Sequence, residues 1–147
     1  LALLQTDASI SHAELGARVN LSASQCSRRI ARLQELGIIR GTVALLDEAE
    51  LGLQLEAYVT VTLSSYARSE VQAFHSRVVE LPQVIECCSL TGDSDYLLRV
   101  LTKDRAAFSK FLNEDLLGHG DVARVRSSIV LDRIKRTTAL PLPDSHT

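Results

Sequence analysis

Trp and Met are absent from this 147-residue sequence, and aromatic residues account for only 4% of it. A buried core must therefore be built mainly from aliphatic side chains. The 3 prolines and 7 glycines are too few for a collagen-like or linker-dominated chain. No apolar run approaches the roughly 18 residues that a membrane-spanning helix needs, which excludes such a helix, and we expect no membrane partner. With 46% hydrophobic and 23% charged residues, the sequence predicts a folded globular protein.

Cysteine is also scarce, because Cys26, Cys87 and Cys88 are the only three. An odd number with two adjacent members does not make a disulfide framework, and no Cys or His spacing suits zinc. We therefore expect no metal and no cofactor. The N-terminus lacks the basic residues and the long apolar run of a secretion signal. These absences together indicate a protein of the reducing cytoplasm.

The charges are nearly balanced overall but unevenly distributed. The formal net charge is −2, which argues against diffuse binding to nucleic acid. Residues 22–33, however, contain Arg28, Arg29 and Arg32 and no acid, whereas the sequence from Glu48 onward has 11 basic and 14 acidic residues. A short basic helix on a slightly acidic body favours a localised contact with an anion. A solvated helix face is the alternative interpretation.

Two helix starts lie close together near the N-terminus. Ser11 to Glu14 (SHAE) and Ser22 to Gln25 (SASQ) are both capping boxes, in which a serine caps the helix and a Glu or Gln follows three residues later. The spacing leaves room for only a short first helix. Asn20, in the link, tolerates the left-handed conformation of a tight turn. The pattern predicts two short helices joined by such a turn.

The second of these helices is predicted to run from Ser22 to about Leu36. Cys26, Ile30 and Leu33 follow the i, i+4, i+7 spacing of a buried stripe, and Gly37 is a suitable terminator. Other residues of the helix project away from this stripe or flank the exposed face: Ser24, Gln25, Ser27, Arg28, Ala31 and Arg32.

The rest of the chain predicts a second domain. Residues 38–46 (IIRGTVALL) are expected to be extended, and residues 47–55 form a linker rich in acidic and small residues. After it, strand-like alternation and helical spacing occur in the order β-α-β-β-α-β, over 57–63, 71–81, 84–90, 96–101, 108–116 and 125–131. We therefore predict an α+β protein with domains 1–46 and 56–147, the second of them ferredoxin-like. The tail from Ala139 is expected to be mobile.

The N-terminal pattern is that of a helix-turn-helix, whose second helix fits the major groove of DNA. The start of this helix at Ser22 offers free N–H groups to a phosphate, and Arg28 and Arg32 can make charge-assisted contacts. The alternative is a helical hairpin with a solvated basic face.

Two motifs carry a resemblance to a known family. The run ELGARVNLSASQCSRRIARLQELGIIRGTVALLD resembles the winged helix-turn-helix half of Lrp/AsnC (feast/famine) transcriptional regulators, and GDSDYLLRV resembles the hairpin of their effector-sensing domain. The resemblance implies a regulator that binds DNA as a homodimer or octamer and senses an amino acid. Members usually have more residues ahead of the first helix, so a start before Leu1 is expected.

Carried over by position, the resemblance also names site residues. The helix that matches the DNA-reading helix gives Ser24, Gln25, Ser27, Arg28 and Arg32 as contact candidates, and its N-terminus adds Ser22. The effector is implied to lie between subunits near the hairpin at residues 92–95, lined by Ser89, Ser128 and Arg105. Leucine-responsive members commonly have a bulkier residue at the position of Ser128, which argues against leucine here.

The hairpin residues also suit an amino acid on chemical grounds. An ammonium needs an acid, for which Asp93 and Asp95 are available, and Asp95 is the preferred partner. A carboxylate needs N–H donors or a cation, which the turn at Gly92 and the side chain of Arg105 offer. The alternative is that Asp93 is a simple turn residue and Asp95 a structural one.

Two other classes of function compete with a ligand-responsive regulator. One is a small-molecule enzyme on a ferredoxin-like domain, with Asp93, Asp95 and His75 as acid–base candidates. The other is an amino-acid sensor that does not bind DNA. The sequence shows no nucleophile–base pair, and an enzyme would leave the basic helix without a role, so we expect no enzyme.

Overall fold

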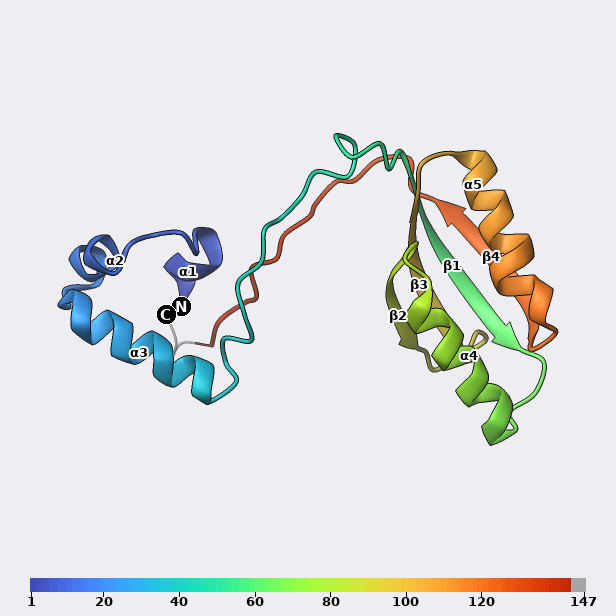
Figure 1. The fold of residues 1–147 in the computed structure, drawn as a ribbon, viewed down its shortest axis with the longest axis horizontal. Coiled ribbons are helices and arrows are strands. Elements are labelled where there is room, and N and C mark those ends of the chain that lie inside the picture. Colours follow the sequence, from blue (N-terminus) through green and yellow to red (C-terminus); the bar gives the residue numbers. More distant parts are fainter. Residues whose placement is uncertain (144–147) are drawn as a thin grey trace. The chain divides into compact units, whose positions relative to one another are not determined.

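The computed structural model describes residues 1–143, whose contacts divide the chain into two compact units (Figure 1). The N-terminal unit comprises Leu1–Leu45 together with residues 134–143, and the C-terminal unit comprises Leu46–Arg133. This division differs from the expected one, which assigned everything after residue 56 to the second domain. The last four residues of that expected domain, 144–147, lie outside the described part.

Gln5 of the N-terminal unit bonds to the returning segment 134–143 at Leu140. The amide of Gln5 donates from Nε2 to the carbonyl oxygen of Leu140 at 3.1 Å, and its Oε1 accepts from the Leu140 N–H at 2.7 Å. Leu140 is thus held at both of its backbone polar groups, although the tail from Ala139 was expected to be mobile.

Helices α1 (Ala2–Thr6), α2 (His12–Val19) and α3 (Ala23–Glu35) form the body of the N-terminal unit. Sequence analysis missed α1, whose apolar residues 1–4 were its only signal. The predicted caps are present at the other two helices. Ser11 Oγ accepts from the Glu14 N–H at 3.2 Å, and Ser22 and Gln25 make the reciprocal bonds of a capping box.

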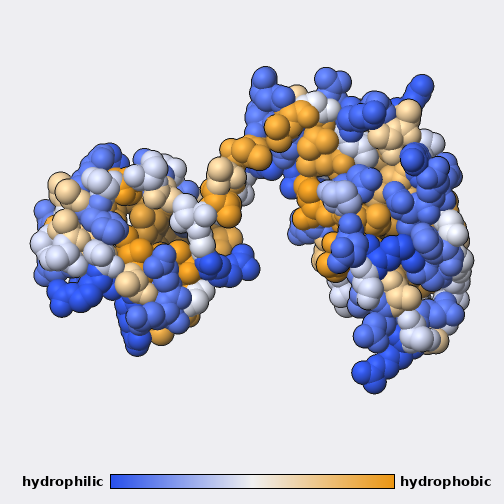
Figure 2. Space-filling model, viewed as in Figure 1, coloured by the Kyte–Doolittle hydropathy of each residue, from blue (hydrophilic) through white to orange (hydrophobic). Residues whose placement is uncertain are grey.

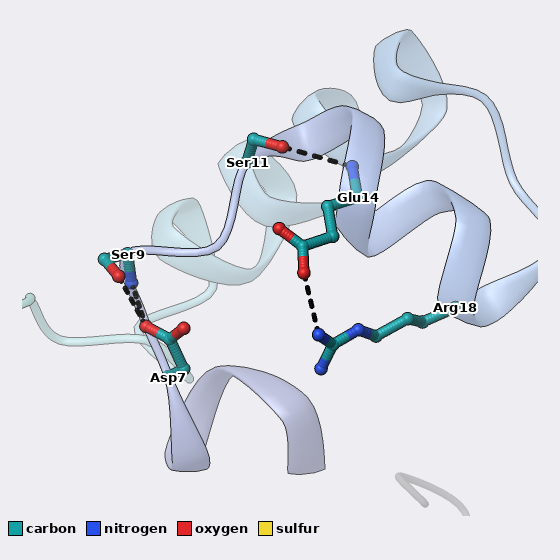
Figure 3. A network of polar contacts seen from close by, with 5 residues as sticks. All are labelled: Asp7, Ser9, Ser11, Glu14 and Arg18. Atoms are coloured by element: carbon teal, nitrogen blue, oxygen red, sulfur yellow. Dashed lines mark hydrogen bonds and ion pairs between the residues drawn. The ribbon is translucent and has the colours of Figure 1, made fainter.

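Polar contacts shape the chain where α1 passes into α2 (Figure 3). Asp7 Oδ1 accepts from the N–H and the hydroxyl of Ser9 at 2.8 and 2.6 Å. The Ser9 side-chain and backbone bonds hold the pKa of Asp7 below its usual value. Within α2, Arg18 of the last turn pairs with Glu14 of the first turn at 2.7 Å.

The turn between α2 and α3 requires two particular residues. Asn20 adopts the left-handed conformation that the sequence predicted, with φ of 55° and ψ of 43°. Gly16 permits a close approach, because a Cβ there would lie 2.4 Å from the carbonyl oxygen of Leu21. The Leu21 N–H also donates to the Gly16 carbonyl at 2.9 Å. A bulkier residue at Gly16 would push the start of α3 away from α2.

The segment after α3 has no strand partner among the described residues. Residues 40–47 belong to neither a helix nor a strand. Val43, Leu45 and Leu46 are all exposed, and Figure 2 shows apolar side chains along this stretch. Residues 40–47 therefore leave aliphatic side chains uncovered in a single chain.

The C-terminal unit has the predicted β-α-β-β-α-β order, which confirms the α+β fold class. Its strands pair antiparallel in the order β2-β3-β1-β4. The fourth strand begins three residues earlier than expected. The elements are β1 (Leu55–Leu63), α4 (Arg68–Glu80), β2 (Val84–Ser89), β3 (Tyr96–Thr102), α5 (Arg105–Lys110) with its π-helical extension η1 (Phe111–Leu116), η2 (Leu117–His119) and β4 (Val122–Ile129).

The core of this unit lies between the sheet and its helices. Val59 on β1 and Leu98 on β3 are fully buried, and so are Phe74 of α4 and Phe111 of η1. The buried residues of β1 and β3 alternate with partly exposed ones, so the helices cover one face of the sheet. Neither α4 nor α5 covers the opposite face, where Glu48 and Arg133 contact Arg99 and Glu56.

Candidate DNA interface and effector site

The predicted DNA contacts share one face of α3. Cys26 is 3% exposed and Ile30 and Leu33 are partly buried, which confirms the predicted stripe. The six candidates are all exposed, and they are Ser22, Ser24, Gln25, Ser27, Arg28 and Arg32.

These residues differ in whether their polar groups already bond to other groups of the chain. Ser22 Oγ and Gln25 Oε1 accept the two capping-box bonds at 3.2 and 2.9 Å, which leaves the Gln25 NH₂ group free to donate. Arg32 pairs with Glu35 at 3.3 Å on the exposed surface. Arg28 makes no ion pair with any other described residue. An arginine fork of this kind suits the two acceptors of guanine in the major groove.

Four of the predicted effector residues gather at one end of the sheet. Ser89 pairs with Tyr96 across the β2–β3 hairpin, and the turn between them contains Gly92, Asp93 and Asp95. Gly92 has φ of 128°, which favours glycine. Gly92 and Asp93 are exposed.

Asp95, the preferred ammonium partner, already accepts two hydrogen bonds within the chain. Its Oδ2 accepts from the Leu63 N–H at 2.8 Å, and its Oδ1 accepts from the Tyr66 hydroxyl at 3.0 Å. This bond to the Asp95 carboxylate raises the pKa of Tyr66. Each carboxylate oxygen of Asp95 therefore has one partner, at the end of β1 or in the loop after it.

The other two predicted effector residues lie away from the hairpin. Arg105 begins α5, beyond the far end of the seven-residue strand β3. Ser128 lies opposite Tyr58, four residues along β4 from Arg124. Arg124, which sequence analysis missed, reaches the hairpin, because its Nη2 donates to the Asp93 carbonyl at 3.3 Å. One chain alone therefore does not bring the six residues into a single cluster.

A charged network on β1 and β3 was also missed. Glu56 accepts from Arg99 and Arg133, and Arg99 lies 3.6 Å from Glu48. Burial raises the pKa of Glu56, but the bonds from Arg133 and Arg99 outweigh burial and leave it below its usual value. Glu48 and Arg133 lie on the segments that enter and leave this unit. No local sequence pattern indicates the register between β1 and β3 that brings Arg99 beside Glu56.

Neither a metal site nor a membrane helix is found in residues 1–143. No group of three or more His, Cys, Asp or Glu residues there is placed to hold a metal ion. No helix in this range is long and apolar enough to cross a membrane. Cys26, Cys87 and Cys88 are free thiols.

Comparisons with known proteins agree with this arrangement. Residues 56–140 match the Lrp/AsnC ligand binding domain, and residues 1–40 match a winged helix-turn-helix DNA-binding domain. The chain is 36% identical to the transcriptional regulator AzlB of Bacillus subtilis over 96% of this chain and 90% of that protein. It is 37% identical to the Bkd operon transcriptional regulator of Pseudomonas aeruginosa, covering 97% and 93% of the two chains.

A solved structure is similarly close. A transcriptional regulator from Neisseria meningitidis, in complex with L-Met, superimposes with a TM-score of 0.92 at 40% identity, covering 96% of this chain and 91% of that one. The match to the ligand binding domain spans more than half of the chain. The chain therefore belongs to the Lrp/AsnC family of DNA-binding transcriptional regulators.

Proposed function

We propose that this regulator reads duplex DNA with the exposed face of α3 and that an amino acid bound to the C-terminal unit changes its affinity for DNA. The observation that carries the proposal is the turn at Gly16 and Asn20. It fixes α3 with Cys26 buried and with Ser24, Ser27 and Arg28 exposed. A helix presented in this way fits the major groove, with its N-terminal residues at the base edges.

The six candidates divide by chemistry. Arg28 and the free NH₂ group of Gln25 suit base edges. Ser22, Ser24 and Ser27, close to the helix N-terminus, suit phosphate oxygens. Arg32 is partly neutralised by Glu35, so its contribution is electrostatic and smaller.

The proposed effector is an α-amino acid bound at the hairpin end of the C-terminal unit. Asp93 is the acid proposed for the ammonium, because its side chain is exposed whereas the Asp95 carboxylate has two internal partners. The turn at Gly92 and the side chain of Ser89 supply polar groups beside it. Arg105 and Ser128 complete the proposed site from a second chain, because neither lies at the hairpin in the same chain. The neighbour's L-Met supports this class of effector.

A homodimer or a larger homo-oligomer is part of the proposal. The face of the sheet opposite the helices and the exposed Val43, Leu45 and Leu46 are apolar or mixed surfaces that a second copy can bury. Light scattering should give at least twice the mass of one chain at micromolar concentration. A monomer would reject both the assembly and the shared effector site.

We assign no catalytic step to this protein. The proposed DNA target implies a cytoplasmic location. His75, the base of the enzyme alternative, lies 2.8 Å from the Tyr96 hydroxyl. The Asp95 carboxylate accepts hydrogen bonds from the Leu63 N–H and the Tyr66 hydroxyl. These contacts support structural roles for both groups.

The test has two arms. Duplexes are selected from random DNA by the purified protein, and binding is measured against salt. In parallel, the twenty amino acids are screened by thermal shift. We expect salt-dependent duplex binding and stabilisation by a small set of amino acids. Amino-acid binding without any DNA binding would instead indicate a DNA-free sensor.

A further inference from the structure

We infer that residues 134–143 form a basic arm that contacts DNA phosphates, with Lys135 as the contacting side chain. This inference rests on the proposed DNA binding and adds a second contact surface to it. None of the six residues assigned to DNA belongs to this segment. The arm would strengthen binding to every duplex without choosing among sequences.

The arm belongs to the unit that contains the helix-turn-helix. Although it follows β4 in the chain, its contacts group it with Leu1–Leu45. Gln5 of α1 holds it at Leu140 through two hydrogen bonds, of 2.7 and 3.1 Å. Pro141 and Pro143 follow at once, and their fixed φ and missing N–H oppose helix formation there. The arm is therefore an extended segment attached to α1.

The basic side chains around the start of the arm fall into two environments. Arg133, the last residue of the C-terminal unit, is half-buried and pairs with Glu56. Lys135 and Arg136 are exposed. Lys135 makes no ion pair with any residue in the described range. The charge of Arg133 thus stabilises the fold, whereas that of Lys135 is available to a partner.

Charge distribution points to a polyanion as that partner. Residues 1–45 have five arginines and three acids, and residues 134–143 add a lysine and an arginine without an acid. Leu46–Arg133 has nine basic and fourteen acidic residues. The arm therefore increases the positive charge of the unit that contains α3, on a chain that is acidic elsewhere. Exposed cations on an extended backbone suit phosphates, which lie along the outside of a duplex.

The test measures how binding depends on salt. Each phosphate contact contributes about 0.9 to the slope of log K against log salt for B-DNA. Lys135→Gln should lower the slope by about 0.9, and should weaken selected and unrelated duplexes alike. The matched control is Lys103→Gln, which removes one exposed charge from the C-terminal unit. This control should keep the wild-type slope.

Three results would overturn the inference. One is an unchanged slope in Lys135→Gln. Another is weakening confined to the selected duplex, because this indicates base contacts. The third is loss of slope in the Lys135→Arg variant, which keeps the charge. Circular dichroism of each variant verifies the fold, and Gln5→Leu, which releases the arm without removing charge, should weaken binding to both duplexes. If the wild-type protein binds no duplex, the proposed function fails instead.

Discussion

The two units of this chain bury apolar surface to very different extents. The C-terminal unit has a cluster of thirteen buried hydrophobic residues, which includes two fully buried phenylalanines, Phe74 and Phe111. In the described part of the N-terminal unit, only Leu15, Gly16 and Cys26 are buried. Their charges are also opposite, because basic residues predominate in the N-terminal unit and acidic ones in the C-terminal unit.

This contrast indicates that the C-terminal unit supplies most of the core that stabilises the chain, whereas the N-terminal unit supplies the surface for DNA. A large core stabilises the C-terminal unit in proportion to the apolar area it removes from water. The N-terminal unit depends more on local devices, which are its two capped helices, the left-handed Asn20 and the close approach at Gly16. A unit with so small a core leaves most of its residues at the surface, where α3 can meet DNA.

The largest effect is expected from a core substitution in the C-terminal unit. Phe74→Ala removes a fully buried ring and should lower the free energy of unfolding by about 3–5 kcal/mol. Calorimetry should show an earlier transition for this unit. The control is Val79→Ala on the same helix, where the side chain is 80% exposed and the change should be under about 0.5 kcal/mol. Equal effects at both positions would contradict the proposed core.

A substitution in the helix turn should affect the other unit. Gly16→Ala places a Cβ against the Leu21 carbonyl and should destabilise the N-terminal unit by about 1–3 kcal/mol. Hydrogen exchange should quicken in α2 and α3 but not in β1 or β3. Gly41→Ala is the matched control, because nothing lies within 4 Å of its added Cβ. If Gly16→Ala leaves exchange unchanged, the close approach does not define the turn.

A smaller effect is expected when the fold stays intact but a DNA contact is lost. Arg28→Ala should weaken binding to the selected duplex by about 1–3 kcal/mol, the range for a base contact. Fluorescence anisotropy measures this change, and circular dichroism should remain that of the wild type. Arg18→Ala, which removes an exposed arginine paired with Glu14, should leave sequence discrimination unchanged. Undiminished affinity in Arg28→Ala would remove Arg28 from the reading face.

The mildest effect concerns pH. The pKa of Glu56 is lowered in the folded state, so its contribution to stability is present above the pKa of the unfolded chain and is lost as pH falls through the folded pKa. The melting temperature of the C-terminal unit should therefore fall in acid, and Glu56→Gln should flatten that fall. Glu14→Gln, at an exposed pair, should not. An unchanged acid profile in Glu56→Gln would contradict the network.

Local patterns predicted most of the fold. The capping boxes at Ser11 and Ser22 located α2 and α3, and period-two alternation located β1 and β3, because both signals are complete within a few residues. Helix α1 was missed, since five residues are too few to show a helical period. The start of β4 was misplaced because its register against β1 shifts between Thr62 and Leu63.

Long-range contacts could not be predicted in this way. Gln5 and Leu140 are 135 positions apart, and nothing in either local sequence indicates that they meet. Asp95 shows the same limit at a candidate site residue. Its place in a turn suggested a ligand, whereas its partners Leu63 and Tyr66 come from another strand and the loop after it. The exposed face of α3 was predictable because it depends only on helical periodicity.

The central claim is that ligand binding in one unit changes DNA binding by the other. The most direct measurement is the Kd for the selected duplex, taken with and without a saturating concentration of the amino acid that stabilises the protein most. The account predicts a change of about 5- to 150-fold, the usual range of coupling between two sites, and the same ratio in Arg28→Ala despite its weaker binding. An amino acid that binds tightly yet leaves the Kd for DNA unchanged would contradict the account.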